Sequence, residues 1–220
     1  MKTIVVAPHP DDETLGAGGT LLRRKAEGGN IGWLIVTSLS TSKGWSKAKV
    51  EKRSEEIRSV AEFYGFDSVF ELNFPSTRLD EVAIGDLVAA ISGVFKDFSP
   101  EEVFVPNPSD VHTDHRVVFD AVASCTKWFR YPSVKRVLAY ETLSETEFGL
   151  NRSQTFNPNV FVDIEGYLDG KCQAMGMFET EVFDFPFPRS YEAIRALATL
   201  RGAASGYQFA EAFELLRERA

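Results

Sequence analysis

The stretch Thr3-Ile4-Val5-Val6-Ala7-Pro8-His9-Pro10-Asp11-Asp12-Glu13-Thr14-Leu15 contains most of the information on how this chain folds. Its first five residues form a short β-branched apolar run, which is typical of a buried strand, and two prolines follow that run. Apolar residues then recur at helical intervals as far as Gly28 and Gly29. The sequence therefore predicts a strand, a polar turn that contains His9, and a helix.

The same alternation continues along the chain. Strands are predicted over residues 3–7, 31–37, 68–72, 102–106 and 134–141, and helices over residues 14–28, 47–64, 82–98 and 114–129. This order indicates an α/β, Rossmann-like fold, in which helices cover both faces of a mostly parallel sheet. After Ser144 the pattern loosens to a strand at residues 160–162 and helices over residues 191–200 and 209–219. We interpret this last part as a C-terminal cap.

Length and composition limit the classes of protein to consider. A chain of 220 residues with 44% hydrophobic content can bury a sizeable core, so we expect a single domain over residues 1–220. The formal net charge of −8 provides no broad basic surface, which argues against nucleic acid as a partner. Cys125 and Cys172 are expected to be reduced and buried. No segment approaches the roughly 20 apolar residues of a membrane helix, so we expect no transmembrane segment and a cytoplasmic protein, with a homo-oligomer left open.

The three histidines of the chain all lie in two short acidic clusters. His9 belongs to the first cluster, and the second is Asp110-Val111-His112-Thr113-Asp114-His115. Each cluster begins within a few residues of the carboxyl end of a predicted strand, so the two clusters could meet over one crevice. Imidazole and carboxylate are ligands of catalytic divalent metals, and three protein ligands leave one position open. The sequence therefore indicates a metal-assisted enzyme.

Helix capping is the simpler interpretation of the first cluster. Aspartates at a helix start stabilise it by roughly 0.5–2 kcal/mol without any catalytic role. Two adjacent aspartates beside a histidine are harder to explain in this way, because neighbouring like charges are unfavourable without a cation or a proton. We therefore interpret His9 and Asp12, three residues apart across a turn, as metal ligands, and Asp11 as a free general base.

The second cluster has a similar simple interpretation, a polar, capped helix start in which His115 is an exposed first-turn residue and His112 is a loop histidine bonded to the backbone. If it takes part in the metal site, one of its two histidines completes a set of two histidines and one aspartate, since binding by both would fill a tetrahedral shell. We assign His115 as the ligand and His112 as the acid. Spacing alone allows the reverse assignment.

Two further features have ordinary explanations. The glycine-rich stretch Gly16-Ala17-Gly18-Gly19 lies inside the first predicted helix rather than in the turn before it. It therefore indicates close packing between helix and sheet rather than a dinucleotide site. Arg53, three residues before Glu56, is by default part of a solvated, salt-bridged helix face.

Together, Pro8–Glu13 and the segment ending at His115 resemble the two signature motifs of the LmbE/PIG-L-like zinc-dependent N-acetylglucosaminyl deacetylases. The resemblance extends to Arg53-Ser54-Glu55-Glu56 and to residues 207–213. It implies Zn²⁺ ligands at His9, Asp12 and His115, with Fe²⁺ or another divalent ion as alternatives. It also implies a general base at Asp11, a catalytic His112 held by Asp114, and a substrate contact at Arg53.

The activity implied by this resemblance is hydrolysis of the acetamide of an N-acetylglucosamine-like sugar or sugar conjugate to a free amine and acetate. Such a step belongs to surface-polysaccharide or glycoconjugate biosynthesis, and its partner is a small-molecule N-acetylated sugar or glycoconjugate. Two other functions stay open. The same ligand set forms the facial triad of non-haem iron oxygenases, and a non-catalytic, metal-stabilised sugar-binding protein would need neither Asp11 nor His112.

Overall fold

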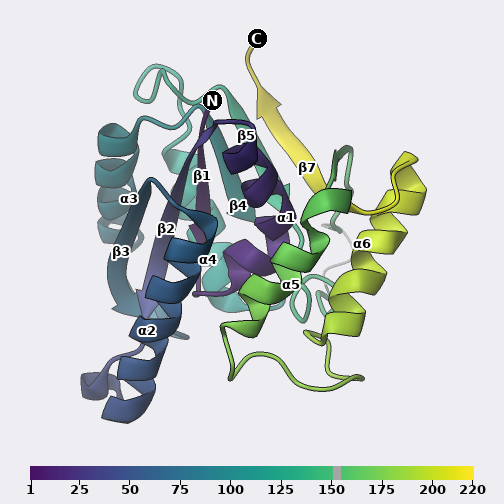
Figure 1. Cartoon of the computed structure of the whole chain (residues 1–220). Helices are drawn as coiled ribbons and strands as arrows, with labels where there is room; N and C mark the ends of the chain where they lie inside the picture. The colour runs from purple at the N-terminus through teal and green to yellow at the C-terminus, as the bar shows by residue number, and fades with distance from the viewer. Residues whose placement is uncertain (151–154) are drawn as a thin grey trace.

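A seven-stranded sheet runs through the computed structural model, which describes residues 1–150 and 155–220 (Figure 1). Its strand order is β3-β2-β1-β4-β5-β7-β6. The first five strands of this order pair in parallel, and β7 pairs antiparallel with both β5 and β6. The bounds are β1 (Lys2–Ala7), β2 (Asn30–Ser38), β3 (Ser68–Pro75), β4 (Glu102–Pro106), β5 (Arg136–Tyr140), β6 (Val160–Asp163) and β7 (Ala210–Glu218).

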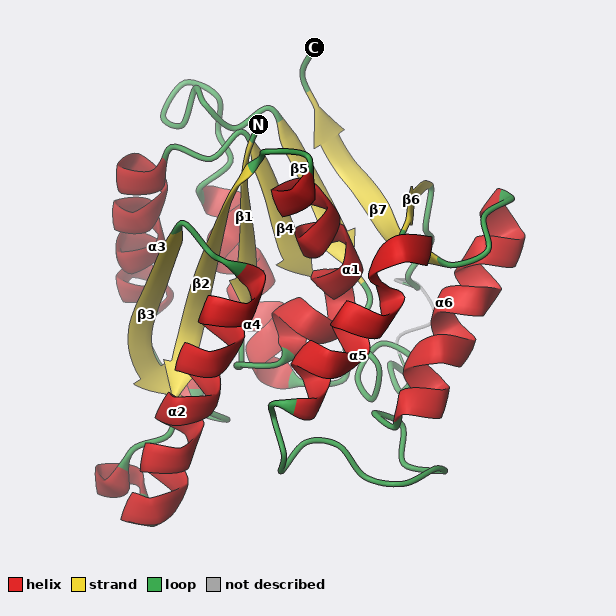
Figure 2. Cartoon of the chain, in the orientation of Figure 1, coloured by secondary structure: helices red, strands yellow, loops and turns green. Residues whose placement is uncertain are grey.

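Helices cover both faces of this sheet (Figure 2). One face packs against α1 (Asp12–Ala26), α2 (Lys47–Tyr64), α5 (Leu168–Gly176) and α6 (Tyr191–Ser205). The other face packs against α3 (Ile84–Phe98) and α4 (Thr113–Ser124). The predicted α/β, Rossmann-like fold with its mostly parallel sheet is therefore confirmed. None of the helices in the described residues is both long and apolar enough to cross a membrane.

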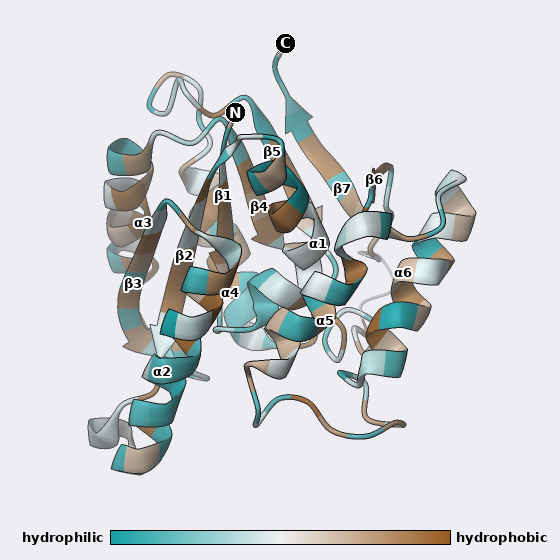
Figure 3. Ribbon diagram, viewed as in Figure 1, coloured by the Kyte–Doolittle hydropathy of each residue, from teal (hydrophilic) through white to brown (hydrophobic). Residues whose placement is uncertain are grey.

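The apolar run of β1 is explained by burial on both of its faces. Val5 and Ala7 contribute to the core beneath α1 and α2, whereas Ile4 and Val6 contribute to the core beneath α3 and α4. Neighbouring strand residues point to opposite faces, so a strand covered on both sides needs apolar residues at every position. Figure 3 shows the result as brown strands between helices whose outer surfaces are largely teal.

The glycines of α1 allow this helix to pack closely against its neighbours. A Cβ atom at Gly16 would lie 2.1 Å from Cδ2 of Tyr140, and one at Gly19 would lie 2.8 Å from Cγ2 of Ile164. Tyr140 also donates a hydrogen bond of 2.9 Å from its hydroxyl to the carbonyl of Val6. The glycine-rich stretch therefore has the packing role expected of it.

The prediction of a helix over residues 209–219 is wrong, because this segment forms strand β7. Its alanine, glutamate, leucine and arginine residues favour a helix locally, but hydrogen bonding to two strands outweighs that preference. The C-terminal part therefore extends the sheet in addition to covering it with α6 and with α5, a helix that the sequence pattern did not reveal.

A buried ion pair attaches β7 to the helices above it. The carboxylate of Glu211 accepts hydrogen bonds from the backbone N–H groups of Gly19 and Thr20 at 2.9 and 2.7 Å. It also accepts one from the ammonium group of Lys171 on α5 at 2.7 Å. Both charged side chains are almost completely buried.

We expect Glu211→Ala to lower the free energy of unfolding by about 3–5 kcal/mol, because it leaves the Lys171 ammonium group buried without its partner. Glu218→Ala is the matched control, since Glu218 lies on the same strand and pairs with Arg136 at the surface. Its effect should not exceed about 1 kcal/mol. Urea denaturation of both variants measures the difference, and equal losses would contradict the assigned role of Glu211.

Candidate metal centre

The two histidine clusters lie beside each other at the carboxyl ends of β1 and β4. These strands are neighbours, and β2 flanks β1 on its other side, so the strand order reverses here. The turn after β1 is fixed to the end of β2 by Thr37. Its backbone N–H and its hydroxyl donate to the Pro8 carbonyl at 3.1 and 2.8 Å.

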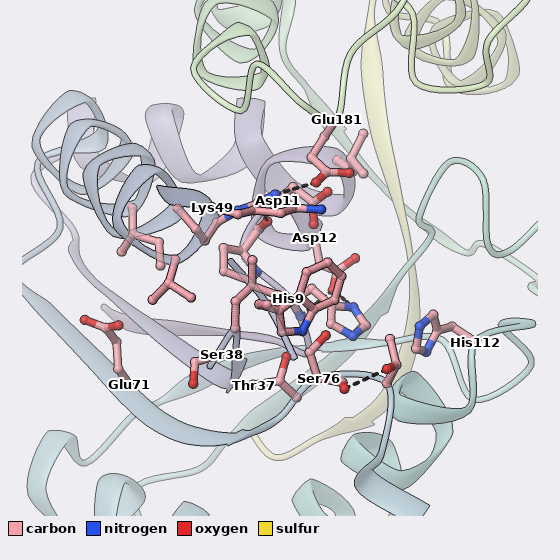
Figure 4. Close-up of a pocket in the computed structure, with 18 of the residues that line it drawn as sticks. His9, Asp11, Asp12, Thr37, Ser38, Lys49, Glu71, Ser76, His112 and Glu181 are labelled. Atoms are coloured by element: carbon pink, nitrogen blue, oxygen red, sulfur yellow. Dashed lines mark hydrogen bonds and ion pairs between the residues drawn. The ribbon is translucent and has the colours of Figure 1, made fainter. Parts of the chain in front are cut away.

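His9, Asp12 and His115 converge on one point (Figure 4 shows His9 and Asp12). Oδ2 of Asp12 lies 3.4 Å from Nδ1 of His9 and 3.3 Å from Nε2 of His115. One candidate ligand atom from each residue lies within 4.8 Å of the others. The structure thus brings together the three residues that the sequence indicated as ligands.

The surroundings of His115 fit a bound cation. Its Nδ1 hydrogen-bonds to Oδ2 of Asp110 at 2.8 Å, and Oδ1 of Asp110 accepts from the hydroxyl of Thr146 at 2.6 Å. Its Nε2 is buried, and among the described residues it makes no hydrogen bond of good geometry, although Oδ2 of Asp12 lies 3.3 Å away. A buried polar atom without a partner is unfavourable, whereas metal-binding histidines commonly have their second nitrogen held by a carboxylate. A divalent ion between His115 and Asp12 would satisfy this nitrogen.

Asp114 contacts His112 as expected, but through its backbone N–H group, while its carboxylate contacts His9. Oδ2 of Asp114 lies 3.0 Å from Nε2 of His9. The same carboxylate accepts from the backbone N–H groups of Thr77 and Leu79 at 2.7 and 3.1 Å. Asp114 is buried in the first turn of α4 and His112 precedes that helix, and ligand atoms of both side chains lie within 4.8 Å of one another and of His9. Asp114 therefore connects His9 to the segment after β3.

His112 caps α4, as the simpler interpretation of the second cluster predicts. The backbone N–H of Asp114 donates to its Nδ1 at 3.1 Å. A ring nitrogen that accepts a hydrogen bond carries no proton, so the proton of the neutral ring lies on Nε2. Burial and the nearby charges of His9 and His115 lower the pKa of His112 to about 4. This residue is therefore a neutral hydrogen-bond donor at the edge of the site.

Asp11 adopts a backbone conformation that is rare for a residue with a side chain, with φ of 135° and ψ of −27°. Its carboxylate makes no capping hydrogen bond to α1 within the described residues, although Asp11 stands at the cap position. Its Oδ2 instead accepts from Nη1 of Arg189 at 2.8 Å. Burial and the charge of Asp12 raise the pKa of Asp11 to about 7, although Arg189 acts in the opposite direction.

Arg53 is buried rather than part of a solvated face. It forms the expected ion pair with Glu56, with Nε of the arginine 3.1 Å from Oε2 of the glutamate. Its Nη1 donates to the Pro10 carbonyl at 2.9 Å, and its Nη2 pairs with Glu181. These contacts show that Arg53 supports the turn that carries His9 and Asp12, the candidate metal ligands. Contact with a substrate remains a prediction.

A pocket of about 330 Å³ opens over these residues (Figure 4). His9, Asp11 and His112 line one part of it, and Lys49 and Glu71 line another. Apolar and aromatic side chains contribute to the wall formed by α2 and the loop before it, namely Leu39, Trp45, Val50 and Ile57. A concave site of this size and mixed lining suits a small polar molecule.

Sequence reasoning assigned no role to three residues of the site. Asp110 orients His115, while Glu181 and Arg189 reach the site from the segment between α5 and α6. The position of Asp110 within the second acidic cluster was a usable signal. No comparable signal marks Glu181 or Arg189, because their contacts depend on how the C-terminal part packs.

Comparison with known proteins gives a consistent result. The sequence model described as PIG-L, GlcNAc-PI de-N-acetylase, matches residues 4–126, which is more than half of the chain. The diacetylchitobiose deacetylase of Thermococcus kodakarensis is 26% identical over 220 residues, covering 96% of this chain and 81% of its own. The 2'-N-acetylparomamine deacetylase of Streptomyces fradiae is 26% identical over 239 residues, covering 93% of this chain and 79% of its own. The crystal structure of the conserved protein TT1542 from Thermus thermophilus has a TM-score of 0.80 and 28% identity, covering 99% of this chain and 96% of its own.

We expect Asp110→Asn to weaken Zn²⁺ binding by about 10–100-fold, because the amide holds His115 less firmly than the carboxylate does. Asp120→Asn is the control, since Asp120 lies exposed on α4, the helix that carries His115. Competition with a chromophoric chelator measures both affinities. Unchanged affinity in Asp110→Asn would exclude His115 as a ligand oriented by Asp110.

Proposed function

The chain belongs to the PIG-L family of GlcNAc-PI de-N-acetylases, and on that premise we propose that it is a metal-dependent deacetylase of an N-acetylated sugar or sugar conjugate. The relatives named as diacetylchitobiose and 2'-N-acetylparomamine deacetylases support this substrate class. The observation that carries the proposal is the convergence of His9, Asp12 and His115, with the carboxylate of Asp11 beside them and paired with Arg189.

His9, Asp12 and His115 would hold the ion, for which we propose Zn²⁺. Two histidines and one carboxylate with an open position are typical of hydrolytic zinc sites, and Fe²⁺ is an alternative for the same donors. When bound, such an ion would lower the pKa of a water molecule towards about 7 and polarise the acetamide carbonyl.

Asp11 is the proposed general base. It accepts a proton from the water molecule as the water oxygen attacks the acetamide carbon. The same proton can then pass to the amide nitrogen, so that the C–N bond breaks and acetate and a free amine leave. Asp11 suits this task because it adjoins the proposed ligand Asp12, lines the pocket and, in the described residues, makes no helix-capping hydrogen bond.

His112 is the proposed donor to the acetamide oxygen. Since its Nδ1 accepts from the backbone N–H of Asp114, its Nε2 carries the proton. A preorganised N–H group stabilises negative charge as it develops on the carbonyl oxygen. This role requires only a neutral ring, whereas the mechanism inferred from the sequence used a protonated His112.

An oxygenase and a non-catalytic sugar-binding protein are the rival functions. The match to a de-N-acetylase family favours hydrolysis over both. The position of Asp11 supports the same choice, because hydrolysis needs a base beside the metal, while neither rival has an evident use for one.

The decisive experiment combines metal analysis of the purified protein with an acetate-release assay. The substrates are N-acetylglucosamine, N,N′-diacetylchitobiose, N-acetylated nucleotide sugars and N-acetylated glycolipids. Release of acetate that stops on chelation and returns with Zn²⁺ supports the proposal. Turnover that requires iron and oxygen would favour the oxygenase, and sugar binding without acetate release would favour the binding protein.

We expect Asp11→Asn to lower kcat by about 10²–10⁴-fold, because an amide cannot accept the proton from water. Metal content should be unchanged, since Asp11 is not one of the proposed ligands. Asp97→Asn, on the exposed side of α3, is the control and should retain full activity. Undiminished acetate release by Asp11→Asn would reject Asp11 as the base.

A further inference from the structure

The segment between α5 and α6 reaches Asp11 in the turn that follows β1. Figure 1 shows it as a long connection below these two helices. Arg189, near its end, places Nη1 2.8 Å from Oδ2 of Asp11 and 3.1 Å from Oε2 of Glu181. The ion pair between Arg189 and Asp11 joins residues that are 178 positions apart in the sequence.

We propose that Arg189 is a positioning residue for Asp11. It fixes one carboxylate oxygen and thereby directs the other towards the water that attacks the substrate. The inference rests on the proposed function, because it assigns a role to Arg189 only if Asp11 is the general base.

The contacts of Asp11 support this role. Oδ2 is held by Arg189, and the hydrogen bonds of the described residues include none to Oδ1. A carboxylate with one oxygen held by a charge-assisted hydrogen bond has a defined orientation and keeps a free acceptor. Catalysis is sensitive to such orientation, since a displacement of about 1 Å can lower a rate by about 10²-fold.

The backbone of Asp11 is held separately from its side chain. The N–H of Asp11 donates to Oε2 of Glu13 at 3.0 Å, and Arg53 holds the preceding carbonyl of Pro10 at 2.9 Å. The positive φ of 135° shows that these contacts maintain a conformation that Asp11 would otherwise avoid. With the backbone fixed in this way, side-chain rotation is the freedom that remains, and Arg189 restricts it.

Glu181 connects Arg189 to the other arginine of the site. Its Oε2 contacts Arg189, and its Oε1 contacts Arg53. The guanidinium group of Arg189 also lies 5.7 Å from the centre of the Phe187 ring. These contacts hold Arg189 within its own segment, so the guanidinium group is oriented before a substrate arrives.

Direct substrate binding is the competing role for Arg189, because this residue lines the pocket. The two roles predict different kinetics. Loss of a substrate contact that acts equally in the ground state raises KM, whereas loss of a base-orienting contact lowers kcat.

The test compares Arg189→Ala, Arg189→Lys and wild type in acetate release. The substrate is N,N′-diacetylchitobiose, or another compound of the panel if wild type hydrolyses that compound faster. We expect Arg189→Ala to lower kcat by about 10²-fold, with little change in KM or in metal content. Arg189→Lys should recover part of the loss, because its ammonium group can still pair with Asp11. Millimolar guanidinium should partly restore Arg189→Ala, which a purely structural defect would not allow.

Arg195→Ala is the matched control. Arg195 lies on α6 and pairs with Asp169 at the surface, so its removal should leave kcat unchanged. A crystal structure of Arg189→Ala provides a readout that does not depend on activity, and it should show the Asp11 carboxylate rotated from its original orientation. If Arg189→Ala does not fold, the kinetic comparison is made between Arg189→Lys and wild type alone. A wild-type kcat together with a raised KM in Arg189→Lys would then overturn the inference.

Three other results would overturn the inference: a wild-type kcat in Arg189→Ala, a raised KM with unchanged kcat, or an unmoved Asp11 carboxylate. Failure of the proposed function has a different signature, because wild type itself would then release no acetate from any compound of the panel. An active wild type with an unimpaired Arg189→Ala would reject only the role of Arg189.

Discussion

The turn between β1 and α1 is the constraint on which the site depends. It places a proposed ligand histidine, the proposed base and a proposed ligand carboxylate within four residues, His9 to Asp12. Contacts from three other parts of the chain fix it, through Thr37 at Pro8, Arg53 at Pro10 and Glu13 at Asp11. A backbone conformation of the kind seen at Asp11 costs about 1–3 kcal/mol and persists only where its surroundings determine it.

The charges around this turn are arranged to receive a cation. His115 and His9 hold the pKa of Asp12 well below its usual range, although burial acts in the opposite direction. Burial lowers the pKa of His9, but hydrogen bonds from its ring to the carboxylates of Asp114 and Asp12 outweigh burial and raise this pKa to about 9. Without a metal the cluster therefore gathers protons around Asp12. A metal bound by these donors would displace those protons, so metal binding and proton release are coupled.

The sequence predicted those parts of the molecule that depend on local pattern. Five parallel strands could be predicted because short runs rich in apolar residues alternate with helical patterns. The meeting of the two histidine clusters could be predicted from their positions at strand ends. Residues 209–219 were predicted wrongly because their composition favours a helix, whereas their partners β5 and β6 are distant in sequence. For the same reason the partner of Asp114 and the contact between Arg189 and Asp11 could not be predicted. Each of these contacts depends on packing between remote segments.

The C-terminal part is connected to the metal centre through α1. Glu211 on β7 accepts from the N–H groups of Gly19 and Thr20, in the middle of the helix whose first residue is Asp12. Glu211 also binds Lys171 on α5, and the segment that follows α5 carries Arg189 back to Asp11. The helix that presents a proposed ligand and the segment that orients the proposed base are therefore held by one buried carboxylate. This carboxylate belongs to β7, the last strand. Correct pairing of β7 is therefore a condition for the geometry of the site in the turn after β1.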